Sequence, residues 1–488
     1  MSVNYSELLR ALLPEACLVV GALVVLGVDL IACRGRGQAV RMTAASLIGV
    51  VALVGAMFAV IMVGCGGPMF GGVLTLDPLT FATRLGVLGL ALLTVAMCGD
   101  VVRLPNPAEY VAVLLFATTG FTLMAAAQQL LLAFLALELA SLSLYVLAGF
   151  DKSRRESAEA ALKYFLFGGI SAAFLLFGFS LIYGLTGSIE LLEISRQIGT
   201  QPASTLLVVA LVMILVGFGY KAAAAPFHLW APDVYQGAPA SSAALIASAS
   251  KLAGFTLFVR LLWGGFGAAP GHSSMPSWLP VVAIIAAVSL VLGNVAALAQ
   301  SNVRRLLAYS AIGHAGGLLL GVMVAGRAGP GPLFYYAVTY GLAAVGAFGV
   351  IAVVDRAGSC QNITDLAGLH RRSPLLAGCL AIFVLSLAGI PPLAGFFGKF
   401  IVFAEALKSG GLATSTGWLA LLAIAMSAVA LYYYLLILKQ ALVAPPAGSA
   451  ARLKVPADAG IVLVVTALLL LLLGLSPSIV LQLLSRTT

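Results

Sequence analysis

Charged residues are scarce in this chain. Asp, Glu, Lys and Arg together make up 9% of its 488 residues, whereas the apolar types make up 62%. A typical soluble domain is about 25% charged and about 45–50% apolar, so this composition excludes soluble enzymes, DNA-binding modules and disulfide-stapled secreted domains. With a mean hydropathy of +1.11, the sequence predicts an integral membrane protein embedded in a lipid bilayer.

Cysteine motifs and clustered basic residues are missing as well. The six cysteines form no CxxC motif and have no nearby histidine, so the sequence indicates neither a zinc site nor an iron–sulfur cluster. We therefore expect no metal and no redox centre in this chain. The net charge is +9, but the 26 Lys and Arg residues are spread over short loops and helix ends, which argues against a nucleic-acid partner.

Long apolar segments fill most of the sequence. A window of about 19 residues predicts about fourteen membrane-spanning helices, joined by loops too short to hold a folded domain outside the membrane. The predicted fold is an all-α polytopic membrane protein. The segments lie near residues 11–33, 42–63, 77–99, 108–127, 129–150, 158–184, 204–230, 241–262, 279–300, 304–325, 332–355, 374–408, 416–439 and 459–483.

Basic residues are concentrated in the loops that follow the odd-numbered segments. Arg34, Arg36 and Arg41, after the first segment, are an example. Short loops rich in Lys and Arg stay on the cytoplasmic side of the membrane. The bias therefore predicts a multi-pass protein with both termini outside; the expected location is a bacterial plasma (inner) membrane.

Proline interrupts two of the apolar segments. Pro226 lies in the seventh, and Pro391 and Pro392 lie in the twelfth. Proline removes a backbone donor and clashes with the preceding turn, so each helix should break there. If segments four to eight and nine to thirteen form two units, the broken helix is fourth in both, and the odd number of helices inverts the second unit, as in secondary transporters. The predicted domains are residues 1–107 (three helices), 108–262 (first five-helix repeat), 263–440 (second, inverted repeat) and 441–488 (C-terminal helix).

A carboxylate stands about midway along the fifth segment. Glu138 has no charged residue within nine positions on either side, so it should either bind a proton or lie near a cation from another helix. Ser141 and Tyr145 share its helix face. Lys221 is the natural partner, because it precedes the Pro226 break, where unsatisfied carbonyls would be available to an ammonium group and to water.

Two further lysines lie deep in apolar segments. Lys251 is far from both ends of the eighth segment, and Ser248 and Ser250 could form a small polar pocket around it. Lys399 follows the twelfth-segment break, and Glu405 lies further towards the outer end of that segment. Lys399 could close the chain of groups on the opposite face. A buried lysine gains or loses its proton with modest changes in its surroundings, so a line of such groups bridged by water forms a proton path. A lysine stem that snorkels to the interface is the structural alternative for each lysine.

Four other residues have a structural interpretation of comparable weight. Lys163 is a further candidate for the proton relay; alternatively, it forms a helix-surface ion pair with Glu159, one turn before it. His228 and His314 could relay protons because imidazole titrates near neutral pH; alternatively, they hydrogen-bond the broken backbone and a neighbouring carbonyl, respectively. Arg84, near the start of the third segment, is expected at the membrane interface and outside the relay.

The motifs around these residues resemble one family. The run KAAAAPFHLWAPDVYQGAPASSAALIASASKLAGF, from Lys221 to Phe255, strongly resembles the signature of subunit N of proton-pumping NADH:quinone oxidoreductase, respiratory complex I. LALELASLSLYVLAGF, SNVRRLLAYSAIGHAG and GIPPLAGFFGKF resemble that subunit in order and spacing, so the resemblance covers most of the chain after the first three helices. Antiporter-like subunits of the same complex and of multisubunit sodium/proton antiporters share the fold, but DVYQGAP and Lys251 favour subunit N.

The resemblance implies a role for the buried charges. It implies a fourteen-helix antiporter-like subunit in the membrane arm of a proton-translocating enzyme, next to other antiporter-like and small subunits. It also implies no redox cofactor in this chain, with NAD, FMN, iron–sulfur clusters and quinone in other subunits, where quinone reduction drives the protons. The family's proton-handling residues fall on Glu138, Lys221, Lys251 and Lys399.

Two other functions are open from the sequence. An Mrp-like cation/proton antiporter subunit would have the same repeats and buried lysines, and it should exchange ions in vesicles without NADH. A passive assembly scaffold would tolerate neutralisation of Lys251 as long as the complex still assembles.

Overall fold

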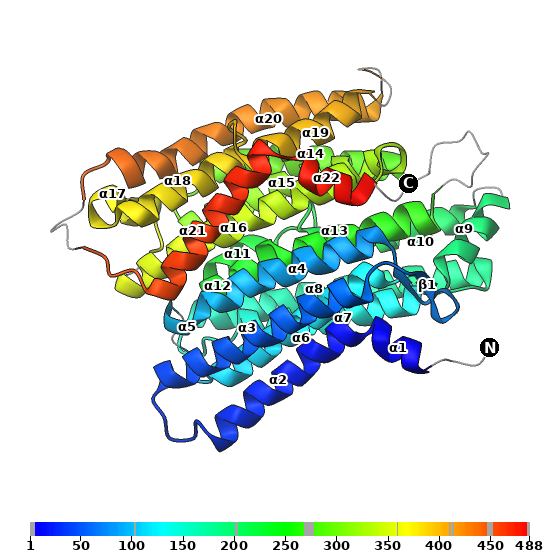
Figure 1. The fold of residues 1–488 in the computed structure, drawn as a ribbon. Helices are drawn as coiled ribbons and strands as arrows, with labels where there is room; N and C mark the ends of the chain where they lie inside the picture. The colour runs from blue at the N-terminus through cyan, green and yellow to red at the C-terminus, as the bar shows by residue number, and fades with distance from the viewer. Residues whose placement is uncertain are drawn as a thin grey trace.

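The fold is a single bundle of long helices that lie side by side (Figure 1). The computed structural model describes residues 5–101, 104–200, 204–267, 278–358, 360–408, 411, 414–446 and 452–485. In these ranges, thirteen helices are long and apolar enough to cross a membrane, and Pro374–Ala388 is a shorter apolar helix. These helices coincide with the fourteen predicted segments. The prediction of an all-helical polytopic membrane protein is therefore confirmed.

The N-terminal region holds three of the long helices and a small hairpin, in which β1 and β2 pair antiparallel. Asp77 is the N-cap of α4, since its side chain accepts a hydrogen bond from the Thr80 backbone N–H. The elements are α1 (Tyr5–Ala11), α2 (Leu13–Ile31), α3 (Gln38–Val63), β1 (Gly67–Met69), η1 (Phe70–Gly72), β2 (Leu74–Leu76), α4 (Pro78–Ala96) and α5 (Cys98–Val101).

The next region contains the predicted segments four to eight. The eighth is interrupted at Ser248, which separates α12 from α13. The elements are α6 (Pro107–Ala126), α7 (Leu130–Ala148), α8 (Arg155–Thr186), α9 (Leu191–Thr200), α10 (Thr205–Ala222), α11 (Trp230–Gly237), α12 (Ala240–Ala247), α13 (Ala249–Val259) and the π-helix η2 (Arg260–Gly265).

The remaining elements contain segments nine to fourteen. They are α14 (Leu279–Leu298), α15 (Val303–Ala328), α16 (Gly331–Ala357), η3 (Ile363–Leu366), α17 (Leu369–Arg372), α18 (Pro374–Ala388), α19 (Ala394–Lys408), α20 (Ser415–Leu438), η5 (Lys439–Val443), α21 (Ala457–Leu475) and α22 (Ser478–Ser485). α1 and α22 lie towards the same end of the bundle (Figure 1), as expected for an even number of crossings. Which end is outside, the inverted relation of the two five-helix units and the domain boundaries stay predictions.

Both predicted helix breaks are present. α10 is closed by Ala223, which adopts a left-handed conformation with φ 55°, three residues before Pro226. α18 is closed by Gly389, which is left-handed with φ 87°, two residues before Pro391. Each break leaves backbone carbonyls without helical partners inside the bundle, where only neighbouring side chains or water can satisfy them.

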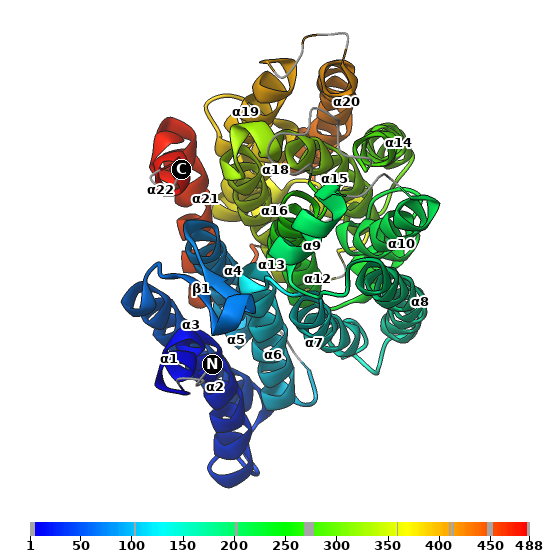
Figure 2. The ribbon, with the colours of Figure 1, turned by 90° about the vertical axis from the view of Figure 1, so that its right-hand side faces the viewer.

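The centre of the bundle consists of α12–α13, α15 and α16 (Figure 2). The apolar window of the Ala240–Gly265 span is entirely buried, and those of α15 and α16 are 94% and 89% buried; for α2, α3 and α8 the value is 33%. The outer helices therefore present apolar side chains outward, to lipid or neighbouring proteins. Polar groups on the central helices bind other helices of the bundle, as Ser241 and Ser242 of α12 bind Tyr110 of α6.

The expected position of Arg84 at the interface is wrong. Arg84 is 2% exposed, and its Nη2 lies 2.8 Å from Oε1 of Glu15 on α2, which is also buried. Its Nη1 donates to the Ala11 carbonyl. The sequence analysis missed this partner because Glu15 lies at the start of an apolar segment, where a carboxylate normally meets water. The pair joins α2 to α4 inside the N-terminal region.

We predict that Glu15→Gln loosens α2 and α4, because the Arg84 guanidinium is then buried without a counter-charge. Breaking a buried pair on one side costs about 3–5 kcal/mol. The measurement is hydrogen–deuterium exchange in the purified protein, which should become faster in both helices. The double variant Glu15→Leu, Arg84→Met removes both charges and should restore most of the protection. Unchanged exchange in Glu15→Gln would contradict the assignment.

Candidate functional site

Glu138 lies on α7 and is partly exposed at the surface of the bundle. Its Oε1 is buried and has no hydrogen-bond partner among the described residues. The charge of Lys221 acts on it, but Lys221 Nζ donates to the hydroxyl of Ser141, at 3.2 Å, one turn along the face of Glu138. Lys221 thus binds a serine of the helix that carries Glu138, and the two charged groups form no direct ion pair.

Lys221 lies in the last turn of α10, just before the left-handed Ala223. It is 5% exposed. A cation is favoured at this position by the partial negative charge of the helix C-terminus. Its amine also lies 5.9 Å from the centre of the Phe121 ring, a distance at which an aromatic face attracts a cation. Lys221 therefore lies at the helix break, but its hydrogen-bond partner is the Ser141 hydroxyl and not one of the carbonyls that the sequence analysis expected.

Lys251, on α13, is 3% exposed. Its Nζ donates to the Ala311 carbonyl of α15 at 2.6 Å and lies 5.4 Å from the centre of the Tyr340 ring of α16. The expected pocket of Ser248 and Ser250 is not its binding partner, since the Ser248 hydroxyl donates to its own helix at Ala244. The pocket of Lys251 is built by the neighbouring central helices.

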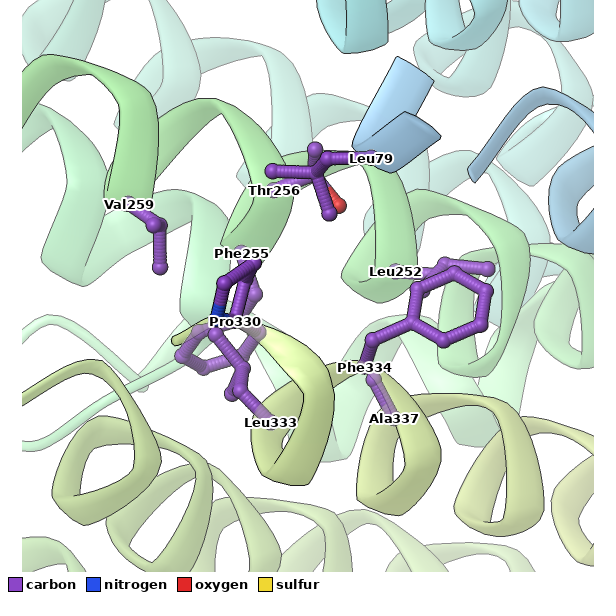
Figure 3. A pocket seen from close by; sticks show the side chains of 9 residues that line it. All are labelled: Leu79, Leu252, Phe255, Thr256, Val259, Pro330, Leu333, Phe334 and Ala337. Atoms are coloured by element: carbon purple, nitrogen blue, oxygen red, sulfur yellow. The ribbon is translucent and has the colours of Figure 1, made fainter. Parts of the chain in front are cut away.

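A neighbouring face of α13 borders a mostly apolar cavity. Figure 3 shows Leu252, Phe255 and Thr256 of α13 turned towards α4 and α16. They border a cavity of about 10 Å³, whose other walls are almost entirely apolar. Water needs about 10–15 Å³ and two or more polar partners, so this cavity does not suit a water molecule. Lys221 and Lys251 border a second cavity of about 10 Å³ between α10 and α13, whose other walls are apolar.

His314 lies on α15, one turn after the carbonyl that holds Lys251. Its Nδ1 is 2.8 Å from the Tyr336 hydroxyl, and its Nε2 is 3.2 Å from the Tyr434 hydroxyl. Tyr434 is also hydrogen-bonded to Ser310. The carbonyl suggested as an alternative partner for His314 is therefore wrong. The sequence analysis missed these three hydroxyls. Uncharged Tyr and Ser are common in membrane helices, and burying them costs much less free energy than burying a charge, so nothing in the sequence singles them out.

Lys399 lies on α19 and is 8% exposed. Its Nζ donates to the carbonyl of Ala388 at 3.1 Å. Ala388 is the last residue of α18, so the helix break leaves this carbonyl without a helical partner. Glu405 does not extend the line of groups, because its carboxylate pairs with Lys408 at 2.8 Å. Lys399, His314 and Tyr336 border a cavity of about 20 Å³, which is large and polar enough for one water molecule. Asn294 and Ser427 complete its polar lining.

Lys163 and His228 differ from these residues. Lys163, 37% exposed, forms the expected pair with Glu159 at 2.6 Å and a second pair with Asp233 of α11, also at 2.6 Å. His228 lies in the α10–α11 break and hydrogen-bonds the backbone at Pro226, as the structural alternative predicts; its Nδ1 has no partner among the described residues. No hydrogen bond in the described ranges joins either residue to the buried lysines.

Several known proteins are similar to this chain over most of its length. Residues 127–431 match a family model described as "NADH:quinone oxidoreductase/Mrp antiporter, TM". A curated relative from Acidobacterium capsulatum, named NADH-quinone oxidoreductase subunit N 2, is 48% identical over 98% of this chain and 99% of its own.

Two solved structures show the same similarity. A chain of respiratory complex I from Thermus thermophilus with bound aureothin is 35% identical, with a TM-score of 0.79, over 96% of this chain and 98% of that chain. A chain of the membrane-bound sulfane sulfur reductase, an archaeal respiratory membrane complex, is 25% identical, with a TM-score of 0.85, over 98% of this chain and 96% of that chain.

Proposed function

This chain belongs to the NADH:quinone oxidoreductase subunit N family, and from this premise we propose that its buried charged side chains are the path along which it moves protons. It is an antiporter-like, proton-translocating membrane subunit of respiratory complex I, and it lies among the other membrane-arm subunits. The observation that supports the path is the burial of three lysine amines that hydrogen-bond only to neutral oxygens. The path consists of Glu138, Lys221, Lys251 and Lys399.

The first step of the path is the pair of Glu138 and Lys221. Ser141 accepts a hydrogen bond from Lys221 and lies one turn from Glu138 on α7, and a hydroxyl can both accept and donate a hydrogen bond. When the carboxylate approaches, it favours the charged lysine; when it withdraws, the lysine more readily releases its proton. Electron transfer elsewhere in the complex changes this separation and so loads or unloads Lys221.

The second step passes the proton to the centre of the bundle. The cavity shared by Lys221 and Lys251 marks the point where α10 meets α13. From Lys251 the groups continue along α15 through His314, with Tyr336 and Tyr434 on its two ring nitrogens. The cavity of about 20 Å³ beside Lys399 has room for a water molecule that completes the connection.

The direction of transport and the redox chemistry complete the proposal. Protons enter from the cytoplasm and leave outside, in a bacterial inner membrane with both termini of this chain outside. The chain acts as part of a translocase and carries out no electron transfer; NAD, FMN, iron–sulfur clusters and quinone are bound by other subunits. The likeness to a chain of a sulfane sulfur reductase supports this division, because the same fold occurs in a complex named for a different redox reaction.

Lys251→Ala is expected to lower NADH-driven proton transport about tenfold or more, since loss of a positioned proton-transfer group costs a factor of roughly 100 or more at its own step. The measurement is acidification of inverted membrane vesicles that contain the assembled complex, together with quinone reduction. Glu138→Ala and Lys221→Ala should give the same defect. Lys408→Ala, which removes an exposed lysine paired with Glu405, is the matched control.

The alternatives give different results in these vesicles. Unchanged pumping with intact quinone reduction in Glu138→Ala and Lys221→Ala would remove both residues from the mechanism. Normal pumping in Lys251→Ala would leave the chain as an assembly scaffold. Cation/proton exchange without NADH would identify an Mrp-like antiporter.

Tyr434→Phe is expected to slow proton transport about fivefold, because it removes the hydroxyl that bridges Ser310 and His314, and one hydrogen bond is worth about 1 kcal/mol. Tyr335→Phe is the control. Its hydroxyl donates to the Leu473 carbonyl of α21, away from the lysines. The rate of vesicle acidification per assembled complex is the measurement. Equal rates in the two variants would show that the proton does not pass Tyr434.

A further inference from the structure

The short helix α11 connects the helices of the first two lysines. Seven residues separate it from α10 and two separate it from α12, so it lies between Lys221 and Lys251 in the chain. It packs against α8 and α15. At its C-terminal end, Gly237 lies so close to the backbone of Glu156 on α8 that a Cβ would not fit. The proton path described above uses no residue of α11.

Asp233 is the charged residue of α11. Its Oδ2 lies 2.6 Å from Lys163 Nζ of α8, and its Oδ1 lies 2.5 Å from Arg305 Nη1 of α15. Burial alone would raise the pKa of Asp233, but the hydrogen bonds from Lys163 and Arg305 outweigh it and lower that pKa. The carboxylate therefore stays ionised. Lys163 belongs to the first five-helix unit, residues 108–262, and Arg305 to the second, residues 263–440, so one carboxylate joins the two units.

Lys163 has a second carboxylate at the same distance. Glu159 Oε1 lies 2.6 Å from its Nζ, one turn earlier on α8. If Lys163 leaves Asp233, it keeps a counter-charge, and Asp233 keeps Arg305. The side chains of Lys163 and Glu159 are 37% and 62% exposed, and exposed ion pairs are weak. We call the contacts of Asp233 with Lys163 and Arg305 the junction. Its arm in the first unit, the Lys163–Asp233 contact, can therefore open and close at little cost.

The second unit also holds the end of α11. Arg304, next to Arg305, donates to the carbonyls of Gln236 and Ala238 at 3.4 Å, while its Nη2 pairs with Asp355 of α16 at 2.9 Å. Arg304 is 4% exposed. These contacts satisfy carbonyls that the C-terminus of α11 leaves free. The end of α11 is thus fixed to α15 and α16, whereas Lys163 is the part of the junction that can change.

The position of α11 is transmitted directly to Lys221. Trp230, the first residue of α11, donates from Nε1 to the carbonyl of Tyr220, at 3.1 Å, and Tyr220 immediately precedes Lys221. The Trp230 ring stacks on Tyr164, with centroids 4.4 Å apart, and the Tyr220 hydroxyl donates to the Tyr164 carbonyl at 2.7 Å. Tyr164 in turn follows Lys163 in the chain. A shift of the Lys163–Asp233 contact therefore reaches the backbone of Lys221 through few, rigid contacts.

We propose that Asp233 is a positioning residue that couples the two five-helix units: by binding one cation from each, it sets the place of α11 and with it the place of Lys221 in the proton path. This inference rests on the proposed function and adds a coupling element to it. Asp233 takes no proton from the path. Its role is to let the arrangement of α15 in the second unit affect Lys221 in the first unit.

The test is Asp233→Asn in inverted membrane vesicles that contain the whole complex. The amide keeps the size of the side chain but removes its charge, so α11 loses its hold on both cations. We expect proton transport, normalised to the assembled subunit, to fall about threefold or more, within the range that residues of coupling networks produce. Asp233→Glu, which keeps the charge, should restore most of it.

Glu193→Gln is the control, because it removes a partly exposed carboxylate paired with Arg196 on α9 and touches neither Lys163 nor α11. It should pump at nearly the unaltered rate. If Asp233→Asn also pumps normally while Lys251→Ala does not, the coupling role is overturned and the proton path is not. If neither Asp233→Asn nor Lys251→Ala affects pumping, the proposed proton path itself is wrong.

A double-mutant cycle covers the case in which Asp233→Asn prevents assembly. Lys163→Met and Arg305→Met each remove one arm of the junction. If both arms act through one carboxylate, the double variant should be no worse than the more severe single variant. Additive losses of normalised proton transport would show that the two cations act independently, which would overturn the proposal.

Discussion

The structure depends on the cost of burying charge in a membrane. Arginine does not lose its proton, so a buried arginine needs a carboxylate; lysine can become neutral, so it can be held by a neutral oxygen. The described residues follow this division. Every buried arginine among them pairs with an acid, whereas the three buried lysines bind a serine hydroxyl and two carbonyls: Arg84–Glu15, Arg260–Asp77 and Arg304–Asp355, against Lys221–Ser141, Lys251–Ala311 and Lys399–Ala388.

Under the proposed function, this division separates the charges that hold helices together from the charges that move protons. The arginine pairs join helices and stay charged: Arg260, for example, binds Asp77 at the start of α4 and the Ala125 carbonyl near the end of α6. The lysines lie where the backbone or a hydroxyl provides an oxygen but no full counter-charge, so each amine can hold or release a proton as its surroundings change. Two of the lysines adjoin the helix breaks, which provide free carbonyls that a continuous helix does not offer.

Much of this was predictable from the sequence, because it depends on local signals. Hydropathy predicts the helices, proline predicts the breaks, and the cost of a charge in an apolar segment singles out the buried lysines and Glu138. The partners across helices were not predictable, since packing decides which faces meet. An uncharged hydroxyl such as that of Tyr434 gives no signal, and a charge near a helix end, such as Glu15 or Asp233, resembles an ordinary interfacial residue. The same limit explains why Ser248 and Ser250 were wrongly expected to form the polar pocket around Lys251, which instead binds the Ala311 carbonyl.

The central claim is that the buried acid and amines exchange protons during turnover. Infrared difference spectroscopy of the assembled complex, between the resting and the NADH-driven state, measures this directly at Glu138, since a carboxyl group absorbs at a different frequency when it is protonated. The account predicts a carboxyl band that changes with turnover and is lost in Glu138→Gln. A spectrum in which no changing carboxyl band depends on Glu138, while the unaltered complex pumps protons, would contradict it.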